Sequence, residues 1–229
     1  MDHGVSARRW QTPDFQGDPV ALAVALLGQR LVRPTRSGAR VSGLIVETEA
    51  YLGAADLASH ARRGLRTPRN EAMYAGAGTL YVYFTYGMHH CMNVVCGEVG
   101  HPLAVLLRAI APEEGVAVMR RRRKNPRTGI GPPDLRLCDG PGKLCQALAV
   151  DRKLNGIDLA SSSDMWIEER APREKPEGEI ERTPRIGVAY AGEWAAAPLR
   201  FVLRARSRAR HAVGPLPPAA LLRNPRPGR

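Results

Sequence analysis

Short apolar runs alternate along the chain with segments that contain Gly and Pro, and their lengths predict a mixture of strands and helices. Strands are expected over residues 41–51, 79–86, 91–96, 102–110, 186–191 and 199–203. The runs at 79–86 and 91–96 flank Gly87, which predicts a β-hairpin. Helices are expected over residues 20–27, 113–124 and 141–150, with a short one beginning at Thr67–Pro68 and carrying Met73. Because strands and helices do not alternate regularly, the pattern predicts a single α+β domain.

Sequence signals near residue 20 predict the bounds of the first of these helices. Asp18 can cap the amino end, Pro19 suits the first helical position, and Gly28 suits the residue that ends the helix. Two other segments look loose, namely 170–185, rich in Pro, Glu and Arg, and the tail from about residue 205.

Two carboxylates, Glu47 and Glu49, lie on the predicted strand 41–51. The two-residue period of a strand places them on one face with Ile45 and Tyr51, and residues two apart lie roughly 6.5–7 Å from each other. Their apolar neighbours would perturb the pKa of a carboxylate by desolvation. The pair could therefore supply a general base for water or an acid and a base, and its spacing also fits an inverting glycoside hydrolase. Alternatively, both acids simply pair with arginines or face water.

Four aromatic residues fall within six positions of the hairpin. Alternation places Tyr81 and Tyr83 on one face, turns Phe84 away, and leaves Tyr86 at the hairpin tip. Such a run is typical of a core strand. It also suits stacking on nucleobases, which contributes roughly 1–3 kcal/mol per base.

Arg108 interrupts an otherwise apolar strand. A buried guanidinium is costly unless a carboxylate or a ligand pairs with it, so Arg108 either reaches solvent at the strand end or has such a partner. If it faces Glu49, it keeps that carboxylate ionised and helps to hold a water molecule.

The charge of the chain is strongly basic but local. The chain has 34 Lys and Arg against 22 Asp and Glu, a net charge of +12. Seven arginines over residues 204–229 and five cations over 120–124 account for this excess, and the remainder is formally neutral. The excess favours a polyanionic partner, most simply nucleic acid, but carries no selectivity of its own.

Several classes of protein are disfavoured. The Gly140–Lys143 segment lacks the span and the following Ser or Thr of a nucleotide-hydrolysing phosphate loop. The four cysteines form no CxxC pair and are interpreted as reduced thiols, so we expect no metal. No apolar run approaches the roughly 20 residues that cross a bilayer, and the first residues do not resemble a secretion signal. We therefore expect a cytoplasmic protein without a membrane partner.

In chain order, these motifs resemble those of the alkyladenine (3-methyladenine) DNA glycosylase family. The resemblance runs from about residue 21 to residue 203 and rests on Val46–Gly53, Asp56, His60, Thr67–Asn70, Leu80–Met88, Cys91–Asn93, Leu106–Ala109, Gly140–Cys145, Ala191–Trp194 and Pro198–Phe201. It implies a curved, mostly antiparallel sheet with surrounding helices and a β-hairpin that probes DNA. It also implies the domain bounds, with an N-terminal extension over 1–17, the glycosylase domain over 18–204 and a basic tail over 205–229.

The resemblance assigns the catalytic roles. Glu49 matches the base that deprotonates water for attack at C1′, and Arg108 matches a residue that helps to hold this water. The backbone carbonyl of Val188 is a further candidate for that contact. Glu47 becomes a supporting residue, a choice that the spacing alone could not make.

The same resemblance assigns the recognition residues. Tyr51, His60 and Tyr83 would enclose a flipped purine, and Asn93 would disfavour guanine by a clash with its exocyclic amine. Tyr86 would wedge into the stack, while DNA contacts near the site fall on Thr67, Met73, Met88 and Lys143. The sequence departs from the family at His89–His90, where a bulky aromatic residue is expected.

The implied activity is excision of alkylated purines from duplex DNA. The substrates would be 3-methyladenine and 7-methylguanine, extending to hypoxanthine and etheno-adenine, and the product an abasic site without strand cleavage. No cofactor and no obligatory protein partner is implied, and a monomer is expected. A DNA-binding relative without activity and a carbohydrate hydrolase remain the alternatives.

Overall fold

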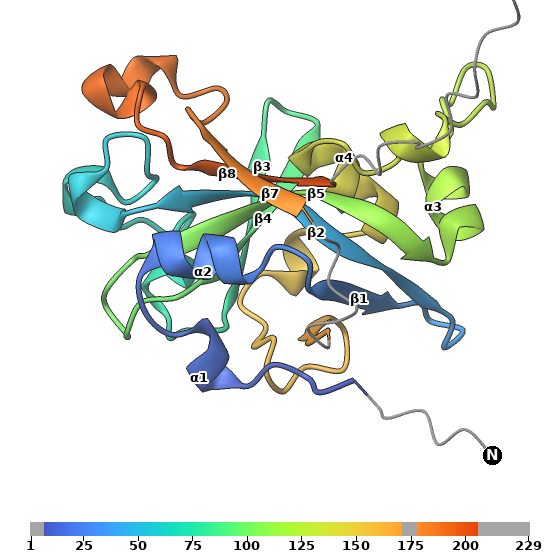
Figure 1. The fold of residues 1–229 in the computed structure, drawn as a ribbon, viewed down its shortest axis with the longest axis horizontal. Helices are drawn as coiled ribbons and strands as arrows, with labels where there is room; N and C mark the ends of the chain where they lie inside the picture. The colour runs from blue at the N-terminus through green and yellow to red at the C-terminus, as the bar shows by residue number, and fades with distance from the viewer. Residues whose placement is uncertain (1–6, 171–177, 206–229) are drawn as a thin grey trace, which may run out of the picture.

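The computed structural model describes residues 7–170 and 178–205, and its centre is a curled antiparallel sheet (Figure 1). Within these residues the strand order is β3-β4-β5-β2-β1-β6, and β8 pairs with both β2 and β7. The strands are β1 (Arg30–Pro34), β2 (Arg40–Tyr51), β3 (Leu80–Thr85), β4 (His89–Val95), β5 (Ala104–Glu114), β6 (Trp166–Glu168), β7 (Gly178–Thr183) and β8 (Arg200–Ala205). The predicted α+β class, with one domain built on a curved antiparallel sheet, is confirmed.

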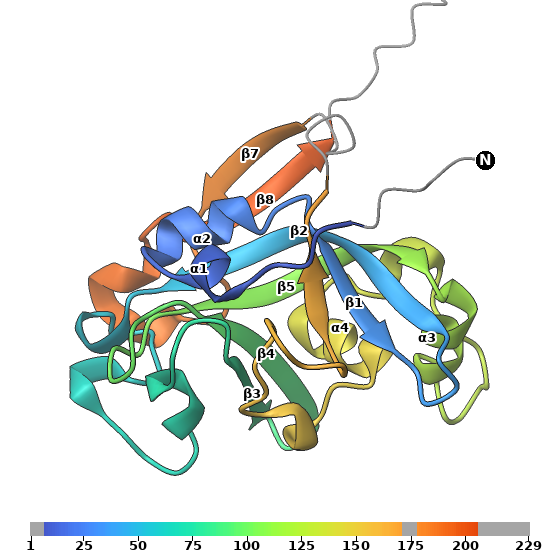
Figure 2. The ribbon, with the colours of Figure 1, turned by 90° about the horizontal axis from the view of Figure 1, so that it is seen from below.

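Helices border both faces of this sheet (Figures 1 and 2). The α-helices are α1 (Thr12–Phe15), α2 (Pro19–Ala25), α3 (Val116–Arg122) and α4 (Pro141–Leu148). Shorter 3₁₀ helices are η1 (Gly53–Ala55), η2 (Arg62–Gly64), η3 (Glu71–Tyr74), η4 (Asp134–Arg136), η5 (Arg152–Leu154) and η7 (Ala189–Ala195). Helix α2 packs on β2 and β5, whereas α4 packs on β4 and β5. No helix in the described part of the chain is long and apolar enough to span a membrane.

Helix α2 begins where the sequence predicts. The Asp18 side chain accepts a hydrogen bond from the backbone N–H of Ala21 at 2.8 Å, and Pro19 follows it at the first helical position. The helix ends at Ala25, three residues before Gly28. The Thr48 hydroxyl on β2 donates to the carbonyl of Ala23, which fixes α2 on the face of β2 opposite Glu49.

Strand β2 is the centre of the sheet because it has three neighbours. It pairs with β5 along most of its length, with β1 near its start and with β8 over residues 47–49. The pairing with β5 shifts register between Ile45 and Glu47, so the regular alternation is broken there. Ile45 is consequently part of the hydrophobic core instead of sharing a face with Glu47 and Glu49, and this part of the prediction is wrong.

The β3–β4 hairpin confirms the predicted pair of strands. Its turn places Tyr86 and Gly87 at φ values of 50° and 66°, and the N–H of Met88 donates to the carbonyl of Thr85. Two successive residues with positive φ match the right-handed twist of a hairpin, and the glycine adopts this conformation without steric cost. The non-glycine residue in that conformation is Tyr86, whose ring is held outside the turn.

Three local predictions need correction. The helix expected over 113–124 begins only at Val116, because β5 continues to Glu114 and Gly115 breaks the strand at a φ of 67°. The strand expected over 186–191 is a turn that leads into η7. The helix expected from Thr67–Pro68 is η3, which starts at Glu71 and carries Met73.

The segments expected to be loose are partly ordered. Residues 178–183 form β7, which pairs with β8, so the predicted loop over 170–185 is wrong for that part. Residues 171–177 and 206–229, which include almost all of the basic tail, lie outside the described residues. Within the predicted N-terminal extension, Trp10 and Phe15 are buried in the core, and their rings lie edge to face at 5.3 Å.

A candidate active site beside the hairpin

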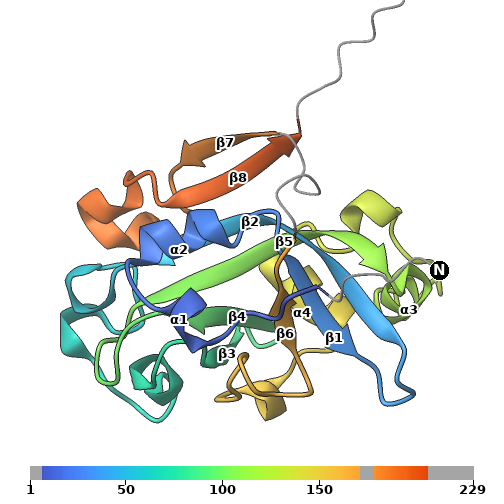
Figure 3. The ribbon, with the colours of Figure 1, turned by 60° about the horizontal axis from the view of Figure 1, so that its bottom comes forward.

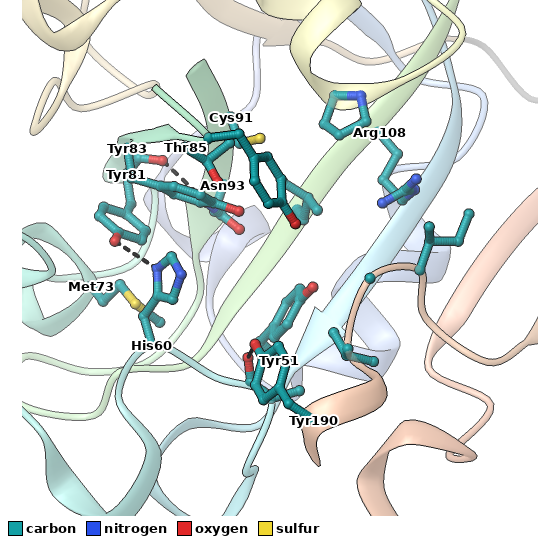
Figure 4. Close-up of a pocket in the computed structure, with 17 residues that line it drawn as sticks. Tyr51, His60, Met73, Tyr81, Tyr83, Thr85, Cys91, Asn93, Arg108 and Tyr190 are labelled. Carbon is teal, nitrogen blue, oxygen red and sulfur yellow. Dashed lines mark hydrogen bonds between the residues drawn. The ribbon is translucent and has the colours of Figure 1, made fainter. Parts of the chain in front are cut away.

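A cavity of about 240 Å³ opens between the β3–β4 hairpin, β5 and the turn that precedes η7 (Figure 4). Of the residues to which the resemblance assigned a role, eight line it, namely Tyr51, His60, Met73, Tyr83, Tyr86, Asn93, Arg108 and Val188. Residues far apart in the chain thus meet at one place. Thr67, Met88 and Lys143 do not line this cavity.

One wall of the cavity is aromatic. The Tyr83 ring lies 4.5 Å from the His60 ring, edge to face, and 5.4 Å from Tyr81 (Figure 4). The Nδ1 atom of His60 and the hydroxyl of Tyr81 share a hydrogen bond of 2.9 Å, which fixes both rings. In Figure 4, Tyr51 and Tyr190 lie across the cavity from this wall. A flat ring inserted between the two groups would have aromatic side chains on both sides.

The imidazole of His60 is uncharged at neutral pH. Burial lowers its pKa to about 4, and the nearby positive charges of Arg69 and Arg62 act in the same direction. A neutral imidazole has one donor and one acceptor nitrogen. Because Nδ1 is engaged with Tyr81, Nε2 is left to hydrogen-bond a ligand.

The carboxylate of Glu49 lies just behind the cavity wall and is fully buried. It accepts hydrogen bonds from the Tyr51 hydroxyl at 2.9 Å and from the backbone N–H of Ile186 at 2.8 Å, and Arg108 Nη1 lies 3.2 Å from Oε1. All three partners line the cavity. Since a carboxylate has about four acceptor positions, these contacts leave about one for a water molecule.

Arg108 joins Glu49 to a second acid. Its Nε donates to Glu47 at 2.7 Å, and Glu47 also accepts from Nε of Arg200 at 2.6 Å. Burial tends to lower the pKa of Arg108, but the charges of Glu49 and Glu47 outweigh this and raise it. Burial tends to raise the pKa of Glu47, but hydrogen bonds from Arg200 and Arg108 outweigh this and lower it. The four groups therefore form a chain of alternating charge, and of the two alternatives left open by the sequence, Arg108 has a carboxylate partner instead of reaching solvent.

These contacts disfavour the carbohydrate hydrolase. An inverting enzyme needs one carboxyl group that is protonated and free to act as an acid. Glu47 is held ionised between two arginines and does not line the cavity, so it cannot take that part.

A buried ion pair behind Tyr51 supports the site and was missed by the sequence analysis. The guanidinium of Arg185 and the carboxylate of Asp56 have no exposed side-chain surface, and they are joined by two hydrogen bonds. Arg185 also donates to the carbonyl of Ala50 and lies 4.7 Å from the centre of the Tyr51 ring. It thereby fixes the position of Ile186, the next residue, whose N–H reaches Glu49. No local pattern indicated that Arg185 is buried, although Asp56 is one of the residues on which the family resemblance rests.

The floor of the cavity is neutral. Asn93 pairs across the sheet with Tyr81 and Leu106, and its side-chain amide donates to the Tyr81 carbonyl at 3.3 Å. The Cys91 thiol beside it is buried, and burial raises its pKa, so it stays protonated and is a poor nucleophile. The other three cysteines are also free and buried, as expected for reduced thiols.

The residues that the resemblance linked to DNA differ in their exposure. The Tyr86 side chain is 80% exposed and Met88 is 69% exposed, both at the hairpin tip. Lys143 forms an ion pair of 2.9 Å with Asp139 at the start of α4. Met73 is buried and lines the cavity, and the backbone N–H of Thr67 donates to the side chain of Asn70. Among the described residues, no cluster of His, Cys, Asp or Glu is arranged to hold a metal ion.

The family model described as methylpurine-DNA glycosylase (MPG) matches residues 13–207. The chain belongs to this family. It is 48% identical to the human DNA-3-methyladenine glycosylase over 193 residues, and this alignment covers 83% of this chain and 64% of the human protein. The mouse protein of the same name is 45% identical, over 84% of this chain and 58% of its own length.

A bacterial member of the family matches over most of both sequences. A Myxococcus xanthus protein, provisionally named 3-methyladenine DNA glycosylase, is 46% identical over 85% of this chain and 90% of its own length. By contrast, the chain spans only about three fifths of the length of the human and mouse relatives. The resemblance identified from the motifs is confirmed.

Proposed function

We propose that the protein is a DNA glycosylase that hydrolyses the bond between an alkylated purine and its deoxyribose in duplex DNA. The observation that carries this proposal is the buried Glu49 carboxylate, which is held by Arg108, Tyr51 and Ile186 directly behind an aromatic cavity. Membership of the family supports it, as do relatives whose names refer to 3-methyladenine.

The site residues have complementary parts in the proposed reaction. A water molecule enters between Tyr51 and Arg108 and loses a proton to Glu49 as its oxygen attacks C1′. The N-glycosidic bond breaks, its electron pair leaves with the base, and an abasic site remains. Arg108 and the carbonyl of Val188 orient the water. General base catalysis of this kind is worth about 10²–10⁴ in rate.

The aromatic groups recognise the base once it has left the helix. The reactive bond of a stacked nucleotide is out of reach, so the nucleotide must flip, and Tyr86 fills the space that it leaves. Tyr51 and Tyr83 stack on the flipped purine, and Nε2 of the neutral His60 hydrogen-bonds it. Asn93, held by the Tyr81 carbonyl, opposes the exocyclic amine of guanine.

The finer assignments rest on the same cavity. We include 3-methyladenine, 7-methylguanine, hypoxanthine and etheno-adenine among the substrates. No lysine lines the cavity as described, which favours hydrolysis without Schiff-base chemistry and strand cleavage. We further propose that the enzyme acts as a monomer, that Thr67, Met73, Met88 and Lys143 lie near the bound DNA, and that residues 205–229 add salt-sensitive affinity for phosphates.

The test is release of free base from duplexes with a single 3-methyladenine, 7-methylguanine or hypoxanthine, at enzyme in excess over DNA. The Glu49→Gln variant should keep its affinity for DNA and lose at least a hundredfold in rate. Glu179→Gln, a change of the same kind at an exposed position of β7, is the matched control and should behave as wild type. Equal rates for wild type and Glu49→Gln would remove Glu49 from its role, and no release by the wild type from any duplex would refute the function.

A further inference from the structure

A second groove lies at the far end of helix α4 from the cavity. It has a volume of about 540 Å³ and is formed by the turn between β1 and β2, by α3, and by the segment from the end of α4 to η5. Figures 1 and 3 show the β1–β2 turn and α3 at the same end of the molecule. Pro141 at the start of α4 lines the cavity and Ala149 just after its end lines the groove. At 1.5 Å per residue, the two lie about 12 Å apart along the helix.

The groove carries a strong positive charge. The cations that line it are Arg33, Arg36, Arg121, Arg122 and Lys153, and the acid among its lining residues is Asp151. The Asp151 carboxylate accepts the backbone N–H of Lys153 at 2.8 Å, and in the described part of the chain it forms no ion pair with any of these cations. Asp164 pairs with Arg33 at 3.1 Å from outside the lining. Most of the positive charge is therefore without a counter-ion in the described part of the chain.

The arginines of the groove lie close together, and the pair between Arg33 and Asp164 neutralises only part of their charge. Arg122 donates to the carbonyl of Ala147, a neutral acceptor that leaves its charge unpaired. Burial lowers the pKa of Arg122, and the neighbouring Arg33 and Arg121 lower it further by repulsion. The Nε atom of Arg33 is buried and has no hydrogen-bond partner among the described residues. An anion in the groove would relieve this repulsion.

The basic residues of the run 120–124 fall into two groups with different surroundings. Arg120 pairs with Asp134, and Arg123 donates to the carbonyl of Leu137, so both serve the structure locally. Arg121 and Arg122 instead line the groove. The run is thus not a uniform cationic patch, because its groove-facing members meet cations from β1, from the β1–β2 turn and from η5.

We propose that this groove binds the phosphodiester backbone of duplex DNA, away from the nucleotide that enters the cavity. The proposal rests on the proposed function for the choice of DNA. The groove has no aromatic residue in its lining, so it has nothing to stack on the base of a free nucleotide. Its cations come from three separate segments, which suits a row of phosphates. A distance of about 12 Å is well within one turn of a duplex, about 34 Å, so the same DNA can reach both sites.

The test compares two double variants of the full chain with equal loss of charge. Arg36→Gln with Arg121→Gln removes two exposed cations from the groove, and Lys124→Gln with Arg127→Gln removes two exposed cations just outside it. Fluorescence anisotropy with an undamaged 25-base-pair duplex gives Kd from 50 to 200 mM KCl. The slope of log K against log salt changes by about 0.9 per phosphate contact. Thermal melts verify that both variants fold.

The groove variant should lose one to two units of this slope and bind roughly tenfold more weakly at 100 mM KCl, while the control stays within twofold of wild type. A slope equal to that of wild type, or an equal loss in the control, would overturn the proposal. Titration with inorganic pyrophosphate covers the other source of phosphate. If wild type bound pyrophosphate, the groove variant did not, and the salt slope for DNA were unchanged, the groove would be a site for small phosphates. That result would also overturn the proposal.

Excision assays separate this proposal from the proposed function. At saturating enzyme, the groove variant should release alkylated base at the wild-type rate, because its groove residues are remote from Glu49. If the wild type released no base but the groove variant showed the predicted loss of salt slope, the glycosylase activity would be refuted. The groove would then remain a nucleic-acid site. Normal excision with an unchanged slope would refute only the groove.

Discussion

Replacing Asp56 by Asn should destabilise the protein more than the loss of an ordinary surface charge. Asp56 is fully buried, its two oxygens pair with Arg185, and it also accepts the backbone N–H groups of Leu52 and Ala58. An amide at this position leaves the Arg185 guanidinium charged in the interior without its counter-ion. Removing one partner of such a buried pair costs about 3–5 kcal/mol. For a domain of this size, that corresponds to a fall in Tm of roughly 6–20 °C.

The matched control is Glu71→Gln, which breaks the exposed pair between Arg66 and Glu71. Both of its side chains are more than half exposed, so the loss should stay below about 1 kcal/mol. Thermal and urea unfolding of both variants give the comparison. The double variant Asp56→Asn with Arg185→Met should recover part of the loss, because the uncompensated charge is then gone.

The same change reaches the active site. Arg185 supports the Tyr51 ring, and the N–H of Ile186 donates to Glu49. Excision by Asp56→Asn, measured well below its Tm, should therefore also be slower than that of Glu71→Gln. If Asp56→Asn lowered Tm by no more than the control did, the reasoning about the buried pair would be refuted.

Three further predictions concern the cavity. Glu47→Gln removes the anion between Arg108 and Arg200. It should lower the single-turnover rate at least tenfold and keep the Kd for lesion DNA within threefold of wild type. An unchanged rate would contradict the supporting role of Glu47. His60 has a pKa of about 4 in the fold against 6.5 unfolded, so the unfolded chain binds more protons between these values and stability falls as pH drops through them. Between pH 7 and pH 4.5, the free energy of unfolding measured in urea should fall by about 2 kcal/mol more for wild type than for His60→Gln. Equal falls would refute the shift in pKa. Tyr86→Ala should change the free energy of unfolding by less than about 0.5 kcal/mol yet weaken binding to a lesion duplex at least tenfold in anisotropy titrations, and unchanged affinity would rule out insertion.

The parts of the site that the sequence predicted are those that local patterns fix. Alternation along one strand places Tyr81 and Tyr83 on the same face, and a glycine after Tyr86 marks the turn of the hairpin. A lone Arg108 in an apolar strand must either reach solvent or pair with an anion, because a buried guanidinium without a partner is too costly, and the local pattern did not decide between the two. The choice of Glu49 over Glu47 came from the family resemblance, since both acids have the same local surroundings.

The remaining parts depend on contacts between distant segments. Asp56 and Arg185 are 129 residues apart, and no pattern in either segment indicates that they meet. The run 186–191 is apolar enough for a strand, but it is too short for its periodicity to decide. Gly187, at a positive φ, turns the chain there into η7, and this turn brings Val188 to the cavity and the N–H of Ile186 to Glu49.

The charge of the candidate site suits the proposed substrates, some of which carry a positive charge on the base. Glu49 and Glu47 alternate with Arg108 and Arg200, so the four groups sum to zero. A protonated His60 would upset this balance and repel a cationic methylated purine from the cavity, but burial keeps its imidazole neutral. Hypoxanthine, which is uncharged, meets the same neutral walls. In the proposed reaction, discrimination among bases would therefore fall to the cost of flipping, the fit against Asn93 and the ease with which the base leaves, and attraction of DNA would fall to positive charge on the surface outside the cavity.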